Sequence, residues 1–167
     1  MAEVYKQAFE DVKEAQKLLG SADNFIHVLL PAIKDNKLIL RAFECLSKAT
    51  VLTISSVLKV EYVNKRINLT RDPKKNLAMF FGKCAFRYGI GNEDVKIIKE
   101  IIILGRKHKE SGLEFSKSGR IIIMDDDFGT NELSLEKMND FLRVVRQLLD
   151  NTNRNFEELF RKVFKVE

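Results

Sequence analysis

Apolar side chains recur every three or four residues along most of this 167-residue chain, and this spacing restricts the fold more than any other feature. The pattern is clearest from about residue 36 to 65, where small residues such as Ala42 and Ala49 favour close approach of neighbouring helices. Only two prolines and eight glycines interrupt the chain. The sequence therefore predicts an all-α fold, an antiparallel bundle of about five or six helices forming one domain over residues 1–167.

Caps and helix breakers set the expected boundaries. Gly20 predicts the end of the first helix, and Pro31 predicts a kink or an end in the second. Asp72-Pro73 is typical of a helix start, because the aspartate caps the first turn and proline fits within it. The stretch 151–153 favours a break in the last helix.

The helical spacing changes between Arg106 and Asp127. Residues 113–116 alternate apolar and polar side chains, residues 117–119 are typical of a turn, and residues 120–124 are rich in isoleucine. This order predicts a small β-hairpin inserted near 113–125.

The same segment holds the candidates for chemistry. His108 can exchange a proton near neutral pH, and Glu110 or Glu114 could orient it, so these three are the candidate catalytic residues. The candidate anion-binding residues are Arg106, Lys109, Ser111 and Arg120. No spacing here is diagnostic of a catalytic class. A helix C-terminus with cations against its dipole explains the same residues.

A second concentration of charge lies within a chain of net charge +5. The basic residues of this stretch are Lys59, Lys65, Arg66, Arg71, Lys74, Lys75, Lys83 and Arg87. Only Glu61 and Asp72 oppose them in the sequence, so the stretch could attract phosphate backbones, with Lys65 and Arg66 as candidate contacts. A solvated helix surface explains the patch equally, and Glu61, Tyr62 and Arg66 are more typical of a surface salt-bridge set than of a groove.

The remaining polar clusters favour structural roles. Cys45 and Cys84 lie in apolar stretches and are expected to be buried thiols. The run 125–127 lacks the spacing of a calcium loop, which favours a solvated acidic turn, and neither a metal site nor a cofactor is expected. The longest apolar runs are too short to span a bilayer and the N-terminus lacks a signal-peptide core, so we expect a cytoplasmic protein without a membrane partner.

Residues 108–126 carry a resemblance to a known family. The shared positions are His108-Lys109-Glu110-Ser111, Glu114-Phe115-Ser116, Arg120, Ile123-Met124 and Asp126. They resemble a segment of an uncharacterised, mostly archaeal family of small helical proteins. The segments 35–37 and 61–67 are similar as well, so the likeness covers most of the chain, with Gly112 where the family pattern has proline. The resemblance implies a helical fold and carries no activity.

The long stretch rich in small residues, Ala42 to Leu58, resembles the HEPN superfamily of helical domains. That resemblance implies binding of RNA or a nucleotide and, for many members, RNase activity. The catalytic signature of the superfamily has an arginine followed after four to six residues by a histidine. Neither His108 nor His27 has an arginine at that spacing.

Three hypotheses follow. The chain is a HEPN-like binding module for RNA or a nucleotide, using the basic patch and residues 106–120; or a metal-independent RNase using His108; or a structural or protein-interaction bundle that self-associates, as a homodimer, through an exposed edge at Ile121–Met124. The sequence does not choose the substrate, the oligomeric state or the physiological process.

Overall fold

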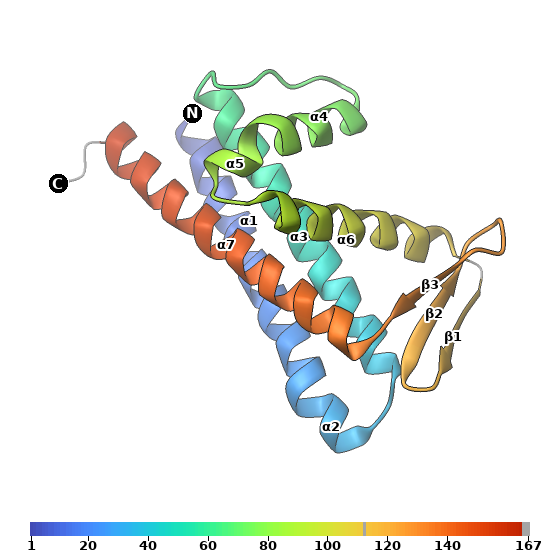
Figure 1. Cartoon of the computed structure of the whole chain (residues 1–167). Coiled ribbons are helices and arrows are strands. Elements are labelled where there is room, and N and C mark those ends of the chain that lie inside the picture. Colours follow the sequence, from blue (N-terminus) through green and yellow to red (C-terminus); the bar gives the residue numbers. More distant parts are fainter. Residues whose placement is uncertain (112, 165–167) are drawn as a thin grey trace.

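The computed structural model describes residues 1–111 and 113–164, and it is mostly helical with a small antiparallel sheet (Figure 1). The helices are α1 (Ala2–Asn24), α2 (Leu30–Ile33), α3 (Lys37–Val63), α4 (Pro73–Met79), α5 (Ala85–Arg87), α6 (Asn92–Glu110) and α7 (Leu135–Phe164). Two π-helical segments, η1 (Phe25–Leu29) and η2 (Phe80–Cys84), join α1 to α2 and α4 to α5. The helical content agrees with the prediction from apolar spacing. No helix within these ranges combines the length and apolarity that a membrane crossing needs.

Helix α3 lies at the centre of the structure and contacts α1, α6 and α7 (Figure 1). Its small residues allow this, because Ala42 and Ala49 are completely buried. On the facing side of α6, a Cβ atom added to Gly105 would lie 2.3 Å from the hydroxyl oxygen of Ser47. Any residue larger than glycine would require Ser47 to move. The backbone of α6 at Gly105 therefore packs directly against the side chain of Ser47 on α3.

Two predicted helix ends are wrong. Helix α1 continues through Gly20 to Asn24, and α7 continues through residues 151–153. A glycine inside a helix costs only about 1 kcal/mol relative to alanine, and the apolar face of α1 continues beyond it with buried Ala22. In α7 the side chains of Thr152 and Phe156 are completely buried, and this packing outweighs the weak helix propensity of the asparagines.

Two other boundary predictions are confirmed. The carboxylate of Asp72 accepts a hydrogen bond from the backbone N–H of Lys74 at 2.9 Å and caps α4, as the Asp-Pro pair predicted. Pro31 lies in the first turn of α2, which ends two residues later at Ile33. There the chain turns through Lys34, whose φ of 58° is left-handed.

The sheet occupies the region where the sequence predicted a two-stranded hairpin. Its strands are β1 (Leu113–Lys117), β2 (Arg120–Met124) and β3 (Thr130–Leu133), in the order β1-β2-β3. The sheet therefore has one strand more than predicted. Strand β3 is not predicted from the sequence, because Thr-Asn-Glu-Leu lacks the alternating apolar pattern of a strand. Strand β2 lies in the middle, and Ile121, Ile122 and Ile123 are at most 6% exposed. The expectation of an exposed edge at Ile121–Met124 is wrong, since β1 and β3 form the edges.

Candidate functional site

His108 lies near the end of α6, half-buried between two carboxylates. Its Nδ1 atom hydrogen-bonds to Oε1 of Glu114 on β1, and its Nε2 atom lies 2.9 Å from Oε1 of Glu44 on α3. The ring also packs edge-on against Phe43, with 6.4 Å between the ring centroids. The structure thus joins His108 to Glu114, as the sequence predicted. It adds Glu44, which no local pattern could reveal because 64 residues separate it from the histidine.

The two carboxylates control the charge of His108. Burial lowers the pKa of His108, but the hydrogen bonds and negative charges of Glu114 and Glu44 outweigh burial and raise the pKa above its ordinary value. An imidazolium donates from both nitrogens, which matches the two acceptors. A general base must instead offer a free nitrogen to its substrate. The geometry therefore favours a structural role for His108, in which it links α3, α6 and β1, over a role as an acid–base catalyst.

The other residues predicted around His108 do not converge on it. Glu110 and Lys109 are exposed at the end of α6. The hydroxyl of Ser111 lies 2.9 Å and 3.0 Å from the carbonyl oxygens of Leu113 and Met124, so it fixes the start of the sheet. Arg120 pairs with Glu132 across the sheet at 2.9 Å. Gly112, where the archaeal family pattern has proline, lies outside the described residues.

Arg106 instead lines a groove between α4, η2, α3 and α6. Two adjoining cavities, of about 650 Å³ and 370 Å³, share Lys74, Leu77, Ile102 and Arg106 in their walls. The floor is apolar and includes Phe81 of η2. The basic residues that line the two cavities are Lys59, Lys74, Lys99 and Arg106. No carboxylate lines either cavity within residues 1–111 and 113–164, and we call this surface the α4–α6 groove.

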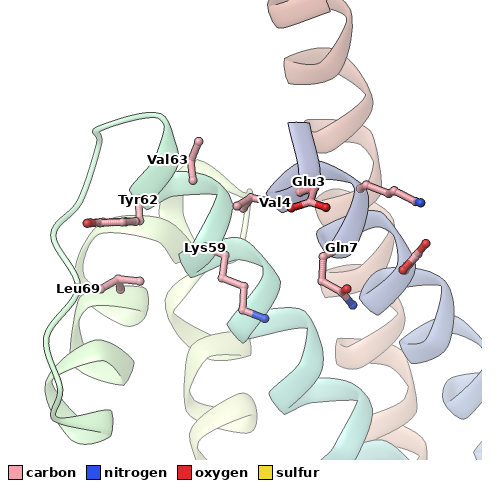
Figure 2. Close-up of a pocket in the computed structure, with 9 residues that line it drawn as sticks. Glu3, Val4, Gln7, Lys59, Tyr62, Val63 and Leu69 are labelled. Atoms are coloured by element: carbon pink, nitrogen blue, oxygen red, sulfur yellow. The ribbon is translucent and has the colours of Figure 1, made fainter. Parts of the chain in front are cut away.

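Past Lys59 and Leu69, the α4–α6 groove adjoins a third cavity of about 560 Å³ between α1 and the end of α3. Unlike the groove, this third cavity has carboxylates in its wall, those of Glu3 and Glu10. Figure 2 shows Tyr62 and Leu69 on one side of this cavity and Gln7 of α1 on the other, with Lys59 reaching between them. Tyr62 is 51% exposed. An aromatic side chain thus lies at each end of this row of cavities, Tyr62 at one and Phe81 at the other.

Most cations of the α4–α6 groove are free of carboxylate partners. Among the described residues, Lys74, Lys99 and Arg106 form no salt bridge, whereas Lys59 lies 3.6 Å from a carboxylate oxygen of Asp11. Lys99 instead places its Nζ atom 5.0 Å from the centroid of the Phe81 ring. These charges are available to an anion without first breaking an ion pair.

A separate cluster surrounds Glu61 at the end of α3. Glu61 is completely buried, and its Oε1 atom accepts hydrogen bonds from Arg66 at 3.2 Å and from the hydroxyl of Tyr88 at 3.1 Å. Arg87 pairs with the other carboxylate oxygen. The prediction that Glu61, Tyr62 and Arg66 form a surface salt-bridge set is therefore wrong for Glu61, because Glu61 lies on a buried face of α3. Burial, followed by the charge and hydrogen bond of Glu61, raises the pKa of Tyr88 well above its usual range.

The cysteines and the acidic turn lie outside the cavities described above. Burial raises the pKa of Cys84 to about 11, with a smaller contribution from Glu61, so its thiol stays protonated at neutral pH. Cys45 is only half-buried, although the sequence predicted burial. A carboxylate oxygen of Asp125 accepts the backbone N–H groups of Asp127 and Gly129, at 3.2 Å and 2.7 Å, and so caps the acidic turn. No group of three His, Cys, Asp or Glu side chains in the described part of the chain is placed to hold a metal ion.

Comparison with known proteins adds no relative: no protein-family model, curated protein or solved structure matches the chain.

Proposed function

We propose that this chain is a HEPN-like, non-enzymatic module that binds single-stranded RNA in the α4–α6 groove. The observation that carries the proposal is the lining of the groove, where Lys74, Lys99 and Arg106 surround an apolar floor without any carboxylate among the described residues. Phosphates of a strand would neutralise these cations, and the bases would cover the floor.

The shape of the groove favours a strand over a single nucleotide. Three cavities adjoin one another in a row through shared wall residues, and the two that form the α4–α6 groove are the ones without a carboxylate among the described residues. Proteins that bind single strands combine a basic groove with aromatic platforms for the bases. Tyr62 and Phe81 supply such platforms at the two ends of the row. A duplex would hide the faces of its bases and gain nothing from either ring.

The arrangement around His108 supports binding without cleavage. Both ring nitrogens already face carboxylates, and neither Glu110 nor Lys109 is placed beside the ring by any hydrogen bond among the described residues. The candidate phosphate contact Arg106 belongs to the α4–α6 groove. His108 and Arg106, which the RNase hypothesis places in one active site, therefore belong to different surfaces.

Replacing Lys74, Lys99 and Arg106 together with glutamine is expected to abolish most RNA binding. Each phosphate contact contributes about 0.7 to the slope of log affinity against log salt for a single strand, so losing three contacts should reduce that slope by about two. Fluorescence anisotropy of a labelled oligouridylate between about 50 and 200 mM salt would measure both the affinity and the slope. Tyr62→Ala should weaken binding further through lost stacking, by about 1 kcal/mol or more.

Lys96→Gln is the matched control for these variants. Lys96 lies on α6, as Lys99 does, but it pairs with Glu93 at 2.9 Å and does not line the α4–α6 groove. This variant should bind like the wild-type protein. Absent or salt-insensitive RNA binding would contradict the proposal, as would equal affinity for duplex RNA or a triple variant that binds like the wild type.

A further inference from the structure

A fourth cavity, of about 410 Å³, lies beside the Glu61 cluster and apart from the α4–α6 groove. Its walls come from the chain after α3, from α5 and from the last turns of α7. The lining residues are Arg66, Arg87, Asn155, Glu158, Leu159 and Lys162. None of them lines the α4–α6 groove or the third cavity that adjoins it, so any ligand here would bind independently of the groove.

Arg66 and Arg87 are held in place from beneath by one buried carboxylate. Each guanidinium uses its Nη1 atom on Glu61, yet the two side chains remain 39% and 41% exposed. No other side-chain partner of either guanidinium occurs among the described residues. An arginine carries five N–H donors, so most donors of both residues remain available at the cavity wall. Such fixed guanidinium groups match the oxygen geometry of a phosphate.

The charges around the cavity leave an excess of positive charge. Arg66, Arg87 and Lys162 are opposed by buried Glu61 and by Glu158. Arginine does not lose its proton at physiological pH, so the excess is permanent. The pair between Lys162 and Glu158, at 3.1 Å, joins two side chains that are both 69% exposed. Exposed pairs of this kind are weak, and Lys162 can turn toward an anion at little cost.

We propose that Arg66, Arg87 and Lys162 form a binding site for a phosphate monoester or free phosphate. The two arginines would each donate to the phosphate oxygens, while Lys162 would add a third, adaptable cation and Asn155 a neutral donor. The amide of Asn155 already donates to the carbonyl oxygen of Asn151, so it has one further N–H to offer. The site does not depend on the α4–α6 groove, and its ligand is a phosphate with at most one ester bond, which the interior of a strand lacks.

Isothermal titration with inorganic phosphate, uridine 5′-monophosphate and uridine, at constant ionic strength, would test this site. We expect both phosphate compounds to bind and uridine not to bind. If uridine 5′-monophosphate binds more tightly than inorganic phosphate, the ligand of the site is a phosphate monoester. If the two bind equally, the ligand is free phosphate. Arg87→Lys keeps the charge beside Glu61 but loses the planar guanidinium, and it should weaken phosphate binding about tenfold.

Lys162→Gln and Arg161→Gln provide a matched pair on α7. Lys162 lines the cavity and should contribute about threefold to phosphate affinity, whereas the neighbouring Arg161 does not line it and should contribute nothing. Thermal melting of each variant would show that the fold is retained. Absence of phosphate binding in the wild-type protein, or equal binding by Arg87→Lys and the wild type, would overturn the site. Either result leaves RNA binding in the α4–α6 groove untouched, because a 5′-hydroxyl oligouridylate tests that surface separately.

Discussion

Replacing Arg66 and Arg87 together with alanine is expected to lower the free energy of unfolding by about 3–5 kcal/mol, the range seen when a buried ion pair loses one partner. The carboxylate of Glu61 is completely buried, and these two arginines are its cationic partners. The exposed part of each arginine reduces its individual contribution, so each single substitution should cost clearly less than the double one. Urea denaturation near neutral pH would measure the difference.

Glu61→Gln provides the control within the double variant. The amide needs no cation and can still accept the hydrogen bond of Tyr88, so it should restore part of the lost stability. A loss of stability well below this range, or no recovery with Glu61→Gln, would contradict the assignment of the two arginines as partners of a buried charge.

The helical part of the fold was predictable because its signals are local. The spacing of apolar residues from Leu38 to Val60 sets α3, and Asp72-Pro73 sets the start of α4. The errors arose where packing outweighs a local signal. Gly20 and the residues 151–153 weaken a helix by propensity, but α1 and α7 each bury a continuous apolar face there.

The candidate sites were less predictable because they join distant residues. His108 and Glu114 are close in sequence and were recognised together, whereas Glu44 becomes their neighbour only through the packing of α3 against α6. Likewise, Glu61 and Arg87 lie 26 residues apart, and their pairing depends on the path of the chain around α4 and α5. A basic patch is visible in composition, but composition does not show which cations keep a carboxylate partner.

The stability of the fold is expected to decrease as the pH rises above neutrality, through the titration of His108. Its folded-state pKa is raised by Glu114 and Glu44, against the lowering effect of burial. The stabilisation is therefore fully present below the unfolded pKa of about 6.5 and is lost as the pH rises through the higher folded value. Urea denaturation at a series of pH values from about 6 upward should show this slope, and His108→Gln should remove it. At the acidic end of that range, His108→Gln should also cost about 1–3 kcal/mol.

The carboxylate partners provide the matched variants. Glu114→Gln should lower the pKa of His108 more than Glu44→Gln, because Glu114 is 21% exposed and Glu44 is 53% exposed. Glu110→Gln is the control, since Glu110 is an exposed carboxylate on the same helix that makes no hydrogen bond to the ring among the described residues. Nuclear magnetic resonance titration of the ring protons of His108 would measure these shifts directly.

The same titration distinguishes a structural role of His108 from a catalytic one. A pKa above the ordinary value, which Glu114→Gln lowers more than Glu44→Gln does, means that the imidazolium holds α3, α6 and β1 together. A pKa at or below the ordinary value, unaffected by either partner, would mean that the ring is neutral with a nitrogen free. His108 would then be a candidate general base, and RNA cleavage by the wild type but not by His108→Gln would establish that role.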